Sequence, residues 1–164
     1  MLPYVILGVI IGIPVFFGLF FRVSASHLFF SVMAGELLGR YFGHDVEQFI
    51  GNTFKDASLT HYSEAIVITL PIILTAIFLK GSISRTKGIL NFFPLIITSI
   101  VYAAFMLPVL PPEVQAELAK VPLGRSLLDT SSAIIGGVVL IQLVALWVLN
   151  RGENGGKGKR RRKD

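Results

Sequence analysis

Residues Ser26–Gly43, with the sequence SHLFFSVMAGELLGRYFG, decide the fold of this chain. The stretch has nearly the length of a membrane span, yet it carries Glu36 and Arg40 four residues apart. Glycine also recurs at every fourth position, at Gly35, Gly39 and Gly43. A helix places these glycines on one stripe and the charged pair on the adjacent stripe. Small residues at this spacing let a second helix approach closely, so we expect tight helix packing here.

The composition around this stretch is typical of a membrane protein. Of the 164 residues, 53% are hydrophobic and only 15% are charged, whereas roughly 25% charged residues are normal in soluble domains. The apolar residues form long blocks, and the mean hydropathy is +0.72. The fold class is therefore predicted to be all-α, a polytopic transmembrane helix bundle. The chain has no cysteine, which excludes disulfides, thiolate metal sites and cysteine nucleophiles.

Five spans are predicted within a transmembrane helical domain over residues 1–149. They cover about 1–21, 26–43, 64–79, 89–110 and 130–149. Between the second and third spans, apolar residues at helical spacing suggest a short, separate helix at the membrane interface. Residues 150–164 are rich in Gly, Lys and Arg and are predicted to be a disordered cytoplasmic tail.

The basic residues predict the orientation. With the N-terminus outside and the C-terminus in the cytoplasm, Arg22, the basic loop 80–88 and the tail all lie inside. Eleven of the fifteen basic residues are then cytoplasmic, as the positive-inside rule requires. A four-span arrangement, in which 26–43 is re-entrant, would place Arg22 outside and fits this rule less well. The expected location is the plasma (inner) membrane, with several passes.

Glu36 and Arg40 have two interpretations. In the structural one, Arg40 extends to the outer interface and holds Glu36 by an i,i+4 ion pair. In the functional one, Glu36 lines a path for an ion, a proton or a solute. We favour the structural interpretation, because Arg40 lies only three residues from the end of the segment.

The glycines have a packing interpretation. Gly8 and Gly12 form a GxxxG pair in the first span, and this face is one candidate partner for the stripe at Gly35, Gly39 and Gly43. A contact between two copies of the chain would use the same chemistry, so a homo-oligomer stays open beside packing within the chain.

No catalytic residues, metal site or cofactor are predicted. The three histidines have ordinary interfacial explanations, and the spans hold no nucleophile with a matched base. Polar residues in the last two spans have two readings, a pathway lining or hydrogen bonds between helices. They are Asn91, Thr98, Ser99, Tyr102 and Gln142.

The basic tail predicts a lipid partner. Six cations lie within seven residues, namely Lys157, Lys159, Arg160, Arg161, Arg162 and Lys163. Such a cluster beside a bilayer binds anionic lipid headgroups. RNA is attracted by the same charge, but a specific nucleic-acid partner is not expected.

The order of these segments resembles the colicin V production protein family of small bacterial inner-membrane proteins. The resemblance covers roughly residues 5–110 and rests on the hydropathy order, the arginine after the first span, and Leu90-Asn91. Members typically have four spans, and the fifth span here departs from that pattern. The resemblance implies a non-enzymatic membrane component or scaffold related to export or the envelope. The alternative is a small oligomeric channel or transporter subunit with Glu36 in the pathway.

Overall fold

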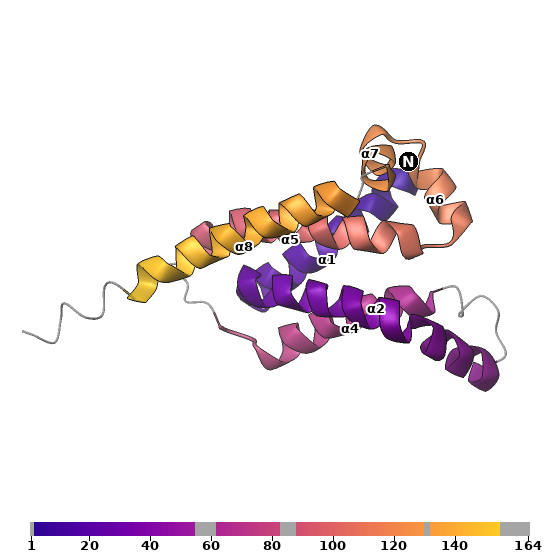
Figure 1. Ribbon diagram of the computed structural model, residues 1–164, viewed down its shortest axis with the longest axis horizontal. Helices are drawn as coiled ribbons and strands as arrows, with labels where there is room; N and C mark the ends of the chain where they lie inside the picture. Colours follow the sequence, from indigo (N-terminus) through magenta and orange to yellow (C-terminus); the bar gives the residue numbers. More distant parts are fainter. Residues whose placement is uncertain (1, 55–61, 83–87, 130–131, 155–164) are drawn as a thin grey trace, which may run out of the picture.

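The computed structural model describes residues 2–54, 62–82, 88–129 and 132–154, and every element within these ranges is a helix (Figure 1). The elements are α1 (Leu2–Phe20), α2 (Ala25–Phe54), α4 (Ser63–Phe78), α5 (Gly88–Met106), the 3-10 helix η2 (Leu107–Val109), α6 (Pro112–Leu118), α7 (Pro122–Leu128) and α8 (Ser132–Asn154). The predicted all-α class is confirmed.

Two helical segments are long and apolar enough to cross a membrane. Leu2–Phe20 and Asn91–Val109 each have 19 residues, with mean hydropathies of 2.3 and 2.1. Ser63–Phe78 and Ile135–Ala145 are apolar but shorter.

Helix α2 differs from the expected segment 26–43. It runs without a break for 30 residues, about 45 Å at 1.5 Å per residue, and so includes the region expected to form a separate interfacial helix. Residues 44–54 contain no proline and a single glycine, so nothing in the sequence stops the helix at Gly43. Helix α8 likewise continues to Asn154, into the segment expected to be a disordered tail.

The main helices form two packed pairs, α2 with α4 and α1 with α5 (Figure 1). Helix α2 also contacts α5, which joins the two pairs. Helix α8 lies along α5, and the short helices α6 and α7 lie near the N-terminal end of α1 (Figure 1). The helices therefore bury their apolar surface mainly against partners that are not their direct neighbours in this part of the sequence, except for the α2–α4 pair.

The buried core takes most of its side chains from α2, α4 and α5. Its fully buried side chains include Leu28, Phe29, Ile68, Leu95 and Tyr102. Gly18 of α1 lets Leu95 approach, since a Cβ atom on this glycine would lie 2.5 Å from Leu95 Cδ1.

Large apolar side chains also cover the outside of the bundle. Phe20, Phe78 and Phe93 each expose more than two thirds of their surface, and Leu140, Ile141 and Trp147 of α8 are exposed as well. Soluble monomers rarely leave contiguous apolar surface of this extent uncovered.

Candidate functional site

The glycine stripe of α2 faces α4. A Cβ atom on Gly35 would collide with the carbonyl oxygen of Ile68 and lie 3.0 Å from its carbonyl carbon. On Gly39 it would lie 2.8 Å from Ile68 Cγ1, and on Gly43 it would lie 3.2 Å from Glu64 Cγ. The three glycines thus let α2 and α4 approach closely in antiparallel directions.

The other predicted glycines do not share this contact. A Cβ atom on Gly8 or Gly12 of α1 would meet nothing within 4 Å. The stripe therefore packs on α4 and not on the Gly8/Gly12 face of α1.

Glu36 and Arg40 form the expected ion pair on α2. Arg40 Nε donates to Glu36 Oε1 at 2.5 Å. The Arg40 side chain is 68% exposed and that of Glu36 only 13%, so the guanidinium lies outside and the carboxylate lies inside. The neighbouring Gly35 packs on Ile68 in the second turn of α4, so Glu36 lies between the Ser31–Thr75 and Gly43–Glu64 contacts of the α2–α4 interface.

Glu64 joins this pair from the other helix. It lies in the first turn of α4, half-buried over Gly39 and Gly43. The charges of Glu36, Arg40 and Glu47 all act on it. We call Glu36, Arg40, Glu47 and Glu64 the acid–base group. Spacing along the chain gave no indication that Glu64 would join it, because its place depends on the register between α2 and α4.

The acid–base group does not form a metal centre. His44 lies at its edge, with Nδ1 3.7 Å from Glu47 Oε2 and Nε2 3.0 Å from Gln48 Nε2. Within the described part of the chain, no three His, Asp or Glu side chains are grouped so that they could hold a metal ion.

The polar residues of the apolar helices pair with one another. Thr69 Oγ1 and Tyr102 OH are 2.8 Å apart, and Ser31 Oγ bonds to Thr75 Oγ1 across the α2–α4 interface. Thr98 and Ser99 donate to carbonyl oxygens one turn earlier in α5.

Gln142 of α8 is paired in part. Its Nε2 donates to the Pro94 carbonyl at 3.0 Å and to Thr98 Oγ1 at 3.3 Å, while its Oε1 is buried without a hydrogen-bond partner among the described residues. This single oxygen is too little to line a path.

Asn91 performs a role that its position in the sequence did not reveal. Its Oδ1 accepts a hydrogen bond from the backbone N–H of Ala25 at 2.8 Å, and its Nδ2 donates to the carbonyl of Val23 at 3.3 Å. The side chain of α5 therefore satisfies backbone groups in the connection between α1 and α2.

The connection between α1 and α2 also bonds to the segment that follows α4. The N–H of Gly81 donates to the carbonyl of Phe21 at 2.8 Å, and the N–H of Ser24 donates to Ser82 Oγ at 3.1 Å. We call the segments 21–25 and 79–82 the turn junction.

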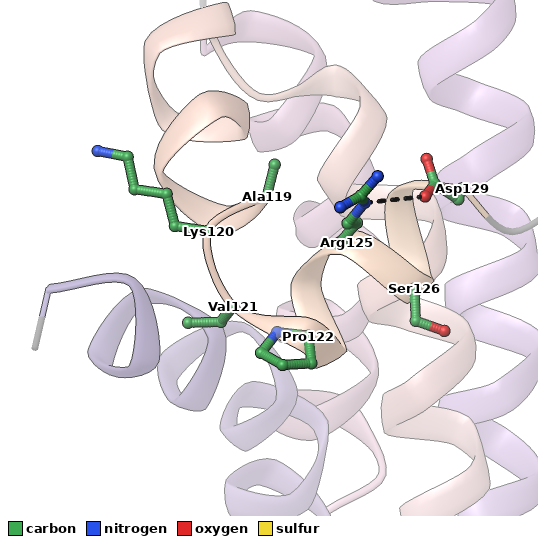
Figure 2. A pocket seen from close by; sticks show the side chains of 7 residues that line it. All are labelled: Ala119, Lys120, Val121, Pro122, Arg125, Ser126 and Asp129. Atoms are coloured by element: carbon green, nitrogen blue, oxygen red, sulfur yellow. Dashed lines mark ion pairs between the residues drawn. The ribbon is translucent and has the colours of Figure 1, made fainter.

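A pocket of about 410 Å³ lies at the other end of the bundle, between α6 and α7 (Figure 2). It is lined by Ala119, Lys120, Val121, Pro122, Arg125, Ser126 and Asp129. Arg125 Nε is 3.7 Å from Asp129 Oδ2, and Lys120 pairs with Glu117. Because acids of the same short helices neutralise both cations, the pocket presents little net charge to a ligand.

Comparison with family models, curated proteins and solved structures gives no match for this chain. The tail cations Lys157 to Lys163 lie outside the described residues.

Proposed function

We propose that the protein is a non-enzymatic, multi-pass component of the bacterial inner membrane, which acts as a scaffold in export or envelope physiology. The five spans are α1, the first part of α2, α4, α5 and α8. The exposed apolar side chains of α1, α4 and α8 support this arrangement, since lipid would cover them.

The bonds at the turn junction support the proposed orientation. Phe21 and Gly81 are in direct contact, so the connection with Arg22 and the one with Lys80 lie at the same end of the bundle. Both are on the cytoplasmic side in the five-span topology. The N-terminus and the α6–α7 region are then outside.

The internal pairing of the polar side chains is the observation that carries the scaffold role. A conducting path needs polar groups that face a cavity. Here the polar side chains bond in two separate pairs instead, Ser31 with Thr75 and Thr69 with Tyr102. The glycine stripe closes the α2–α4 interface further.

Cysteine labelling tests the topology, because the chain has no cysteine of its own. Ala116→Cys in α6 and Ser82→Cys at the turn junction both replace exposed residues. An impermeant maleimide should label Ala116→Cys only from outside and Ser82→Cys only from the cytoplasm. The reverse pattern would overturn the orientation, and labelling of both from one side would overturn the five spans.

The acid–base group favours the second candidate function, an oligomeric channel or transporter subunit. Glu36 and Glu64 place two carboxylates near one arginine at the α2–α4 interface. Ion and proton flux into proteoliposomes separates the two functions. The scaffold predicts no flux that depends on the protein. Flux that Glu36→Gln abolishes in a folded protein would exclude the scaffold.

A further inference from the structure

Arg22 adopts a backbone conformation that arginine rarely takes. Its φ is +54°, and it is the one non-glycine residue with positive φ in the described part of the chain. The N–H of Val23 returns to the carbonyl of Gly18 at 3.1 Å, which makes Arg22 the C′ residue of a Schellman motif that ends α1. Glycine is usual at this position, because a side chain there is strained. Strained residues cluster at sites that bind ligands.

Lys80 lies at the same turn junction as Arg22. Its Nζ is 5.9 Å from the centre of the Phe21 ring, and Phe21 immediately precedes Arg22. The backbone bond between Gly81 and Phe21 fixes the two connections together. Two cations from segments almost 60 residues apart are thus held at one end of the bundle, and both are exposed.

An exposed strip of aromatic rings continues from this point along α1. Phe21 and Phe20 meet edge to face with centroids 5.1 Å apart, and Phe20 stacks on Phe16 at 5.3 Å. Phe20 is 68% exposed and Phe16 57% exposed. A charged head and an apolar strip therefore join through direct ring contacts.

Neither segment of the turn junction, 21–25 or 79–82, contains an acidic residue that could neutralise Arg22 or Lys80. The ion pairs found among the described residues join other groups, at the acid–base group of α2 and in α6 and α7. Glu64 lies in the first turn of α4, at the opposite end of that helix from the turn junction, and Glu113 lies in α6, near the N-terminal end of α1 (Figure 1).

We propose that the turn junction binds one anionic phospholipid, whose phosphate lies between Arg22 and Lys80 and whose acyl chain lies on Phe20 and Phe16. Arginine and lysine are the common binders of phosphate groups, and the apolar strip distinguishes a phospholipid from a free anion. This inference rests on the proposed membrane topology, which places the junction at the cytoplasmic leaflet where anionic lipids attract basic residues.

The full chain, purified in a neutral detergent, is heated with increasing phosphatidylglycerol, with phosphatidylcholine or with inorganic phosphate. Phosphatidylglycerol should raise the melting temperature, and the other two additives should not. Arg22→Gly and Lys80→Gln should each increase the lipid concentration for a half-maximal shift by about fivefold. Lys120→Gln, which removes an exposed cation from the other end, is the matched control and should leave this concentration unchanged. The tail is present in every variant, so its own lipid binding cancels in the comparison.

Arg22→Gly separates binding from folding. Because glycine suits the positive φ, this variant should melt no lower than the unmodified chain without lipid, even though it needs more lipid for the same shift. The proposal is overturned if Arg22→Gly and Lys80→Gln respond like the unmodified chain, if Lys120→Gln weakens the response equally, or if phosphate or phosphatidylcholine gives the same shift. Labelling of the cysteine variants tests the topology independently, so a failed lipid site and a failed topology give different results.

Discussion

Gly35 of α2 lies directly against the backbone carbonyl of Ile68 in α4, where a Cβ atom would approach the carbonyl carbon to 3.0 Å and overlap its oxygen. The obstacle is main chain, which cannot rotate away as a side chain can. The closeness of the two helices therefore depends on the missing side chain at this residue.

Gly35→Ala should lower the free energy of unfolding by about 1–3 kcal/mol, since overpacking forces the two backbones apart. Gly8→Ala is the matched control, because a Cβ atom there meets nothing within 4 Å. The control should gain up to about 1 kcal/mol from helix propensity. Denaturant unfolding in detergent measures both, and equal effects at the two sites would contradict the packing described.

Asn91→Ala should lower the free energy of unfolding by about 1–3 kcal/mol. It removes both bonds to the connection between α1 and α2 and leaves the N–H of Ala25, a fully buried residue, without its acceptor. Asn52→Ala changes the same side chain at an exposed position of α2 and should stay within about 0.5 kcal/mol. Comparable losses in both variants would show that Asn91 does not fix the connection.

Gln142→Leu should leave stability unchanged or raise it slightly. The substitution removes a buried oxygen that has no partner among the described residues. It also removes the bonds from Nε2 to the Pro94 carbonyl and to Thr98 Oγ1, but this carbonyl still accepts a bond from Thr98 Oγ1 at 2.9 Å. Gln142→Ala removes the same groups but opens a cavity, so it should be less stable than the leucine variant by about 2 kcal/mol or more. Melting temperatures of the two variants test this order, and a large loss in the leucine variant would assign a role to the amide.

A double-mutant cycle on Glu36 and Arg40 should give a coupling of about 0.3–0.5 kcal/mol. Arg40 is mostly exposed, and i,i+4 pairs on exposed helix surfaces are worth no more than this. The cycle compares Glu36→Gln, Arg40→Gln and the double variant in denaturant unfolding. A coupling well above 1 kcal/mol would mean that the pair is buried in the membrane-embedded state.

Helical spacing alone predicted that Gly35, Gly39 and Gly43 share one face of a helix that packs closely on another. It did not identify α4 as the partner, because a stripe of small residues fits any helix with a complementary ridge. The Glu36–Arg40 pair was predictable for the same local reason, since four residues make about one turn. The position of Glu64 beside this pair was not predictable, because it depends on the register of a second helix.

The contacts at the turn junction could not be predicted from the sequence for a different reason. Asn91 stood out as a polar residue in an apolar helix, but its partners Val23 and Ala25 lie more than 60 residues away. Arg22 gave no local signal either, because the motif that ends α1 normally carries glycine at that position. The continuation of α2 beyond Gly43 was not predicted, because apolar residues at helical spacing in a polar stretch suggested a short interfacial helix. Helix continuation depends instead on the lack of proline and of repeated glycine.

The pairing of α2 with α4 and of α1 with α5 determines the order in which the protein can assemble. Helix α1 has its main partner in α5 and α2 has its main partner in α4. Neither of the first two helices can complete its contacts while the ribosome is still making the first half of the chain. The glycine stripe stays uncovered until α4 emerges from the ribosome. The N–H of Ala25 lacks its acceptor for longer, because Asn91 follows later in the chain. A nascent chain that ends between α2 and α4 would therefore present an open helix-packing surface at Gly35, Gly39 and Gly43.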